Sequence, residues 1–414
     1  MSPGLRRTLG LWHVTFSGVG VILGAGVYAL IAPAALRAGS ALWLAFLIAA
    51  LAAGFTAYAY ARLGRMRPKD SPEFQYTALA FGPRVGFVAG WLMLVADLMA
   101  AAAVALGFGG YLAHLAGTPI VPNALGLVLG VAIVLFAGIG GSVALALVLT
   151  VVEAAGLVLV IAVGVPSWAT TSYVEMPHGL TGVWEAAALI FFAYLGFDEL
   201  GNLAEEMRAP ERDLPRALGL AFGLTTGVYV CVALSAVAAV DWRELAASPA
   251  PLALVVRRVL GPGAEQVLSL MALAATANTV LLLLLSACRS VYGMAAAGQL
   301  PGRLARIGDR ATPSLATWTV AGVAAALVLG GNLARAAAMT DAAVLVSFML
   351  VNGSLVWIAA RRAEPSLGRV LDVAVPAAGV VMCGALLLHL GWVSLAIALA
   401  IAVVGLLLGR AANR

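Results

Sequence analysis

The chain is poor in charged residues. Only 10% of its 414 residues are charged, whereas a soluble domain usually carries about 25%. Apolar residues make up 63% of the chain. A single soluble core cannot hide that much apolar surface, because such cores stop growing beyond roughly 250–300 residues. The excess must face lipid, which excludes an ordinary soluble protein.

Lysine, cysteine and histidine are also scarce. Because Lys69 is the one lysine, the net charge of +5 comes from arginines in short segments between apolar runs, not from the clustered basic face that binds nucleic acid. The three cysteines lie inside apolar runs and form neither a disulfide framework nor a metal-ligand spacing. The four histidines are scattered, without the i, i+4 pair of a zinc-protease helix. The sequence therefore predicts no metal site, cofactor, nucleic-acid partner or enzyme activity.

Long apolar runs dominate what is present. A membrane-spanning helix needs about 20 mostly apolar residues, and the sequence predicts twelve such spans in an all-α polytopic membrane protein that has the lipid bilayer as its solvent. The third and eighth spans are too long to cross upright, so we expect them to tilt or to extend beyond the lipid. The predicted spans are about 12–34, 38–61, 85–116, 121–139, 143–166, 183–206, 214–240, 263–297, 313–333, 339–360, 370–388 and 391–409.

Positive charge is distributed unevenly between the two sides of these spans. If the N-terminus lies inside, 19 of the 24 Lys and Arg residues fall in inner segments, as the positive-inside rule requires. This predicts cytoplasmic termini, a place in the cell membrane, and two long outer loops at 167–182 and 241–262. Since no soluble domain is predicted, the function must lie within the spans.

Two of the spans carry glycine clusters at their centres. Gly24 and Gly26 lie in the first span, and Gly196 and Gly201 lie in the sixth. Each glycine costs about 1 kcal/mol against alanine in a helix interior, and a broken helix in lipid survives only where its freed backbone groups find partners or line a cavity. Such a break presents N–H groups that suit a carboxylate and carbonyls that suit a cation. The alternative is that the glycines only permit close helix packing.

Interrupted spans in matching positions of two halves indicate a transporter site. Spans one and six are five apart, as a five-plus-five inverted repeat requires. We therefore predict a single transporter domain over 1–414, with repeat one at about 12–166, repeat two at about 183–360 and two extra helices at about 370–409.

Three segments resemble signatures of the amino acid–polyamine–organocation (APC) transporters. They are GVGVILGAGVYAL in the first span, FFAYLGFDELGNLAEEMRAPERDLPRAL in and after the sixth, and ANTVLLLLLSACRSVYGMAAAGQLP at the end of the eighth. The first two together are specific, and the third is weaker. The resemblance is closest to the cationic amino acid transporter branch and its bacterial relatives. It implies alternating access, in which a four-helix bundle rocks against a scaffold.

The same resemblance implies a substrate site made mostly of backbone. The amides around Gly24, Ala25 and Gly26 would hold the substrate carboxylate. The substrate ammonium would be held by carbonyls of both breaks, namely those of Ile22, Phe192, Ala193 and Leu195. The side chains of Phe192 and Tyr194 would border the side-chain pocket or gate it.

Acids inside spans are rare and costly, which makes them functional candidates. Glu153 lies in the fifth span. The resemblance implies a lysine at the matching position in many family members, where it replaces a sodium ion beside the first-span break, and this chain departs from that pattern. Because burial disfavours a charged carboxylate, Glu153 would be neutral at rest and exchange a proton; a structural role and sodium coordination are the alternatives. Thr276 and Thr279 share a helix face and are the hydroxyls that a sodium site needs, but they would equally bond their own helix carbonyls.

Three more acids are coupling or gating candidates. Asp97 lies midway along the third span, where a structural hydrogen bond to a neighbouring helix is the alternative. Asp198 fits the family pattern after the sixth-span break. Glu199 departs from the commoner small residue and would favour a cationic or polar substrate; its alternative is a hydrogen bond that restrains the broken helix.

The sequence thus predicts a secondary active transporter of amino acids or related amines, working as a proton-coupled symporter or as an exchanger. The alternatives are a sodium-coupled carrier, or a transport-silent amino-acid sensor or channel on the same scaffold. The predicted partners are the small-molecule substrate and a proton or a sodium ion.

Overall fold

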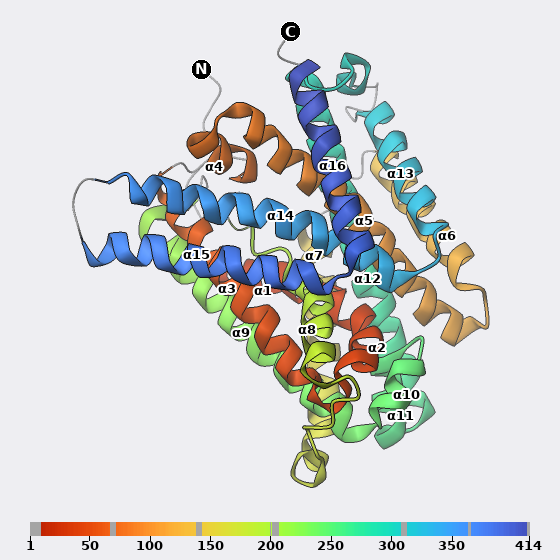
Figure 1. Cartoon of the computed structure of the whole chain (residues 1–414). Helices are drawn as coiled ribbons and strands as arrows, with labels where there is room; N and C mark the ends of the chain where they lie inside the picture. Colours follow the sequence, from red (N-terminus) through yellow and green to blue (C-terminus); the bar gives the residue numbers. More distant parts are fainter. Residues whose placement is uncertain are drawn as a thin grey trace.

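The protein is helical throughout its described parts. Every regular element there is a helix (Figure 1), which confirms the all-α polytopic fold class. Among the described residues, eight helical segments are long and apolar enough to cross a membrane, and four shorter apolar helices lie where spans one, six, nine and twelve are predicted. The count of twelve spans stays a prediction. The computed structural model describes residues 10–66, 72–137, 143–198, 200, 207–307, 313–362 and 366–411.

The helices follow one another with short connections. In the first half they are α1 (Leu11–Leu23), α2 (Gly26–Ala38), η1 (Gly39–Ala41), α3 (Leu42–Met66), α4 (Pro72–Phe81), α5 (Pro83–Ala116), α6 (Ile120–Ala137), α7 (Val143–Gly164) and η2 (Val165–Thr170). In the second half they are α8 (Gly179–Ile190), η3 (Phe191–Tyr194), α9 (Pro210–Ala239), α10 (Trp242–Ala247), α11 (Pro251–Leu260), α12 (Pro262–Ala296), η5 (Gly302–Ala305), α13 (Ser314–Val328), α14 (Leu333–Ala360), α15 (Leu367–His389) and α16 (Trp392–Ala411).

Local sequence explains several helix ends. Proline occupies the first turn of α5, α9, α11 and α12, where its missing N–H has no helical partner to lose. Gly117 closes α5 in the left-handed conformation, which a residue without a Cβ adopts readily. The third and eighth spans are the long helices α5 and α12, of 34 and 35 residues, as expected from their apolar runs.

Some boundaries differ from the prediction. Only η1 separates α2 from α3, because Gly39 has a positive φ of 62° and turns the chain without a loop. The predicted outer loop 241–262 contains the short helices α10 and α11, and α4 precedes the third span. These helices have 6, 10 and 10 residues, so a search for long apolar runs does not find them.

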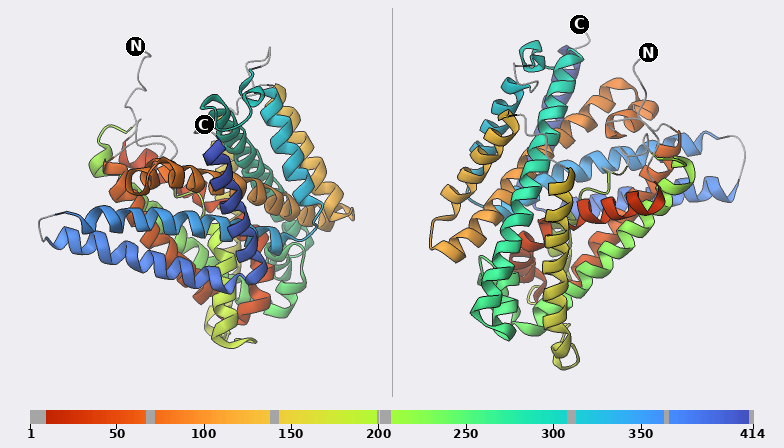
Figure 2. Two further views of the ribbon diagram at one scale, coloured as in Figure 1. Left: turned by 45° about the horizontal axis from the view of Figure 1, so that its top comes forward. Right: turned by 180° about the vertical axis from the view of Figure 1, so that it is seen from behind.

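The short helices lie at opposite ends of the molecule. Figure 1 shows α4 at one end, and α10 and α11 at the other; the reverse view in Figure 2 agrees. This arrangement fits the prediction that the segment before the third span and the loop 241–262 lie on opposite sides of the membrane. The orientation of the two termini stays a prediction.

The interrupted first span lies at the centre of the packing. α1 packs on α9 and α7, while α2 packs on α8, and α3 covers both α8 and α9. α5 is the second packing centre, because it contacts α12, α14, α4 and α6. Its central alanines, Ala100, Ala101, Ala102, Ala103 and Ala105, are all buried. Side chains this small let helix backbones approach closely in a bilayer.

A buried ionic cluster joins α3 to the hairpin of α14 and α15, which lie side by side in Figure 1. The carboxylate of Asp372 in α15 is completely buried. It accepts two hydrogen bonds of 2.6 Å from Arg62, one of 2.9 Å from Arg362 and one of 2.8 Å from the Tyr58 hydroxyl. Charge-assisted bonds of this bidentate kind are among the strongest in proteins, so the cluster fixes three helix ends together.

Asp372→Ala should destabilise the protein, because it leaves two guanidiniums without their counter-charge. We expect a loss of about 2 kcal/mol, below the roughly 3–5 kcal/mol of a fully buried pair because both arginines are partly exposed. Thermal unfolding in detergent measures the effect. Glu244→Gln is the control, since its ion pair with Arg258 is half-exposed on both sides. Equal melting temperatures for the two variants would contradict this role of Asp372.

Candidate functional site

The first span is broken where the glycine cluster predicts. α1 ends at Leu23 and α2 begins at Gly26, so Gly24 and Ala25 interrupt the helix. The Ala25 N–H donates a hydrogen bond of 3.2 Å to Oγ1 of Thr279 in α12. A freed peptide group of the first span thus finds its partner on a neighbouring helix, as a break in lipid requires.

The sixth span also leaves the α-helical path. α8 tightens into η3, and Leu195 then adopts an extended conformation with φ −62° and ψ 149°. Gly196 has a positive φ of 109°, which favours glycine. Its N–H donates to Oδ1 of Asp198 at 3.0 Å, and the Leu195 N–H donates to the Phe192 carbonyl at 3.2 Å. Asp198 therefore restrains the backbone of the break.

The two breaks touch one another. A Cβ on Gly26 would lie 2.8 Å from the Cα of Ala193, and a Cβ on Gly196 would lie 2.8 Å from Cγ1 of Val21. Non-bonded contacts of a Cβ atom are essentially never shorter than 3.0 Å, so a side chain at either position would force the neighbouring atoms to shift. Both glycines are therefore needed for the close approach of the two spans. They allow close packing and also lie at the helix breaks, so the two interpretations do not exclude one another.

Tyr229 of α9 connects the two breaks. Its hydroxyl lies 2.6 Å from the Ile22 carbonyl and 2.9 Å from the Ala193 carbonyl, and the residue is completely buried. A hydroxyl carries one proton, so it donates to one of these carbonyls at a time. Both carbonyls belong to the set that the family resemblance assigns to the substrate ammonium.

Glu153 lies on α7 beside this arrangement. It is 1% exposed, and its Oε1 has no hydrogen-bond partner among the described residues. Its own backbone carbonyl accepts the hydroxyl of the buried Tyr28 at 2.7 Å. Tyr28 and Tyr229 are both close enough to interact electrostatically with the carboxyl. The tyrosines thus connect Glu153 to the two breaks.

The aromatic candidates have different surroundings. Phe192 is buried against the first break, since its Cδ1 would lie 3.3 Å from a Cβ on Gly26. The Tyr194 hydroxyl donates to the Phe46 carbonyl of α3 at 3.1 Å, and its ring centre lies 5.3 Å from that of Tyr229. Tyr194 therefore anchors η3 to α3; a role as a gate remains a prediction.

The remaining candidate acids and hydroxyls have different hydrogen-bond partners. Asp97 accepts a hydrogen bond of 3.1 Å from Ser286 of α12, which agrees with the structural alternative. Glu199 lies outside the described residues. The Thr276 hydroxyl donates to carbonyls of its own helix, those of Ala272 and Leu273. Thr276 thus follows the alternative of bonding its own helix, whereas the Thr279 hydroxyl faces the first break.

A family of known proteins matches almost the whole chain. The family model of amino acid permeases matches residues 9–409. The chain belongs to the amino acid permease family. It is a multi-pass membrane transporter rather than an enzyme, and its substrates are small molecules of the amino acid class. The resemblance to APC transporters is thereby confirmed.

Three relatives illustrate the range of this permease family. The chain is 28% identical to the branched-chain amino acid permease BcaP of Bacillus subtilis, over 94% of this chain and 90% of that protein. It is 28% identical to the methylthioribose transporter of Bacillus subtilis, over 88% of this chain and 84% of that protein. It is 30% identical to the vacuolar cationic amino acid transporter 2 of Arabidopsis thaliana, over 84% of this chain and 59% of that protein.

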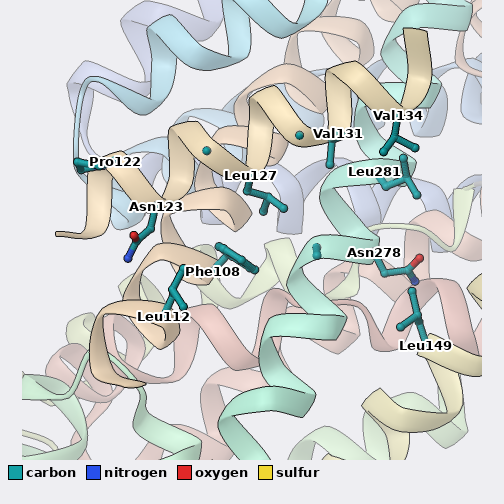
Figure 3. A pocket seen from close by; sticks show the side chains of 13 residues that line it. Phe108, Leu112, Pro122, Asn123, Leu127, Val131, Val134, Leu149, Asn278 and Leu281 are labelled. Atoms are coloured by element: carbon teal, nitrogen blue, oxygen red, sulfur yellow. The ribbon is translucent and has the colours of Figure 1, made fainter. Parts of the chain in front are cut away.

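A cavity of about 550 Å³ lies elsewhere in the permease, between α5, α6, α7 and α12 (Figure 3). Its lining is mostly apolar, with Asn123 and Asn278 as the polar exceptions. Figure 3 shows Asn123 and Pro122 at one end, and Asn278 and Leu149 at the other. None of the predicted substrate-binding residues lines it. The candidate site of the permease is thus defined by backbone groups at the breaks and not by this cavity.

Sequence reasoning missed Tyr28 and Tyr229. Each is an aromatic hydroxyl within an apolar helix, and nothing in the neighbouring residues distinguishes a hydroxyl that reaches a break from one that merely packs. A tyrosine in a span does carry a weak signal, because a buried hydroxyl must find a partner. That partner lies 207 residues away for Ile22 and Tyr229, which local patterns do not reveal.

Gly26→Leu should abolish substrate binding by the permease, because its side chain would collide with the backbone of Ala193. Gly223→Leu is the matched control, since a Cβ there meets nothing within 4 Å. Binding of amino acids to purified protein, followed by ligand-induced thermal stabilisation, measures the effect. Unchanged affinity in Gly26→Leu would remove the breaks from the binding site.

Proposed function

We propose that this permease is a secondary active transporter of amino acids or related amines that works by alternating access, as a proton-coupled symporter or an exchanger. The observation that carries the proposal is the contact between two interrupted spans at the centre of the fold. Carbonyls of both breaks converge on one hydroxyl, that of Tyr229. A position that attracts a hydrogen-bond donor from two sides also suits a substrate ammonium.

The substrate carboxylate is assigned to the first break. The Ala25 N–H has a hydroxyl as its partner, and a carboxylate accepts an N–H bond more strongly than a neutral hydroxyl does. Exchange of the Thr279 hydroxyl for a carboxylate is therefore favourable. The amides of Gly24 and Gly26 flank this position and complete the proposed carboxylate site.

The side chain of the substrate is less narrowly defined. The names of the relatives mention branched-chain amino acids, cationic amino acids and methylthioribose. Phe192 supplies an apolar wall beside the breaks, which supports an apolar side chain. Glu199, which lies outside the described residues, stays the acid predicted for an additional positive charge, whereas Asp97 is bonded by Ser286 of α12.

Proton coupling is assigned to Glu153. A carboxyl that is 1% exposed and has an oxygen without a described partner is tolerated in a bilayer far more readily when it carries a proton. Its proximity to Tyr28 and Tyr229 supports coupling, because Tyr229 also bonds the carbonyls proposed to bind substrate and Tyr28 belongs to α2, the helix that follows the first break. The sodium alternative draws less support, since Thr276 bonds its own helix.

Two structural predictions complete the proposal. The distribution of arginine assigns both termini to the cytoplasmic side of the cell membrane. The five-plus-five inverted repeat, at about 12–166 and about 183–360, is supported by breaks in the first helix of each predicted half.

Counterflow in proteoliposomes tests the transport function. Vesicles that contain the purified protein are loaded with unlabelled L-leucine or L-arginine and diluted into the same labelled amino acid. Transient accumulation of label above equilibrium is expected for at least one of the two, because a carrier exchanges bound substrate across the membrane. A sensor would accumulate none, and a channel would only equilibrate the label; either outcome contradicts the proposal.

Glu153→Gln should flatten the pH dependence of uptake, because the amide cannot carry the exchanged proton. Wild-type uptake is expected to rise as the external pH falls, because the proton is a co-substrate, whereas the variant should show one rate across about pH 5–8. Glu73→Gln is the control, because Glu73 is also buried but bonds Tyr60 in α3. A pH profile that is unaltered by Glu153→Gln would refute the proton role.

A further inference from the structure

A second buried acid lies on α14, apart from the groups proposed to bind the substrate or the proton. Asp341 is 0% exposed. Among the described residues, neither of its carboxyl oxygens has a hydrogen bond of normal length and angle. Buried polar groups almost always have a partner, so an exception needs a physical explanation.

The face of α14 that carries Asp341 is directed at the sixth-span break. Asp341, Leu345 and Phe348 are spaced i, i+4 and i+7, which places them on one side of a helix. The ring of Phe348 lies 6.0 Å from that of Phe191, before the break, and 5.4 Å from that of Phe197, after it. α14 also packs directly against η3.

The backbone N–H of Phe192 faces the Asp341 carboxyl. Phe192 lies in η3, and its N–H directly precedes the carbonyls of Phe192 and Ala193 along the chain. An acceptor that holds this N–H would fix the orientation of the peptide planes that follow it. Asp341 therefore meets the proposed ammonium site through the backbone of η3.

We propose that Asp341 is a positioning residue for the substrate ammonium site, where it accepts the Phe192 N–H and so orients the carbonyls that follow it along the chain. This inference rests on the proposed function, because it assigns the ammonium to the carbonyls of the breaks. With this N–H held by Asp341, the carbonyls of Phe192 and Ala193 are oriented toward the proposed ammonium position, where the Tyr229 hydroxyl lies 2.9 Å from the Ala193 carbonyl.

This arrangement links the affinity for substrate to the orientation of η3. A carbonyl that is turned away from the ammonium forms a weaker bond with it, because a hydrogen bond weakens steeply as it bends. Removal of the acceptor should therefore weaken binding more than it weakens the fold.

Kinetics of L-leucine and L-arginine uptake in proteoliposomes test the inference, with the better transported amino acid as the probe. In Asp341→Ala the KM should rise about five- to tenfold, the effect of one buried hydrogen bond, with Vmax changed less than about twofold. Asp341→Asn keeps an acceptor oxygen, so its KM should stay within about twofold of wild type.

Thr340→Val is the matched control, because Thr340 is equally buried on α14 but bonds its own helix at Ala336; its KM should not change. If Asp341→Ala cannot be purified as a monodisperse protein, Asp341→Ser replaces it with the same expectation, since a serine hydroxyl bonds its own helix. A wild-type KM in the Ala or Ser variant overturns the inference. So does an Asn variant as impaired as Ala, which would indicate a role for the charge or proton. No uptake by the wild type would instead refute the proposed function.

Discussion

Backbone groups inside a bilayer must be satisfied within the protein, and the centre of this permease is organised around that constraint. Two interrupted spans free N–H and carbonyl groups at a depth where water does not serve them. The surrounding helices supply the partners. Thr279 of α12 accepts the Ala25 N–H, and Asp198 accepts the Gly196 N–H. The hydroxyl of Tyr229 of α9 lies between carbonyls of both breaks and donates to one of them at a time.

The same groups are the proposed ligands of the substrate, which gives the permease a simple way to bind reversibly. An ammonium or a carboxylate that arrives at the breaks replaces a neutral hydroxyl, so no buried peptide group is left without a partner in either state. The gain comes from the stronger bond to a charged group. Glu153 is near Tyr229, which takes part in this exchange, and this is why coupling and binding are assigned to one region.

The sequence was sufficient for features that arise from local chemistry. Apolar runs predict the long helices, and the glycines at 24, 26 and 196 predict the two breaks, because few other residues tolerate such backbone in lipid. Features that arise from tertiary packing were out of reach. Tyr229 and Ile22 are distant in the sequence and meet only in the folded protein. Thr276 and Thr279 share a helix face, so their spacing did not distinguish the hydroxyl that bonds its own helix, Thr276, from the one that faces the break, Thr279.

The central claim is that both charged ends of an amino acid are held by the broken helices. The most direct measurement is thermal stabilisation of the purified permease by three matched compounds: a transported amino acid, its amide, which lacks the carboxylate, and the corresponding acid without the amino group. Only the zwitterion should stabilise the protein, because each analogue leaves one set of freed backbone groups with its internal partners. Equal stabilisation by either analogue would contradict it.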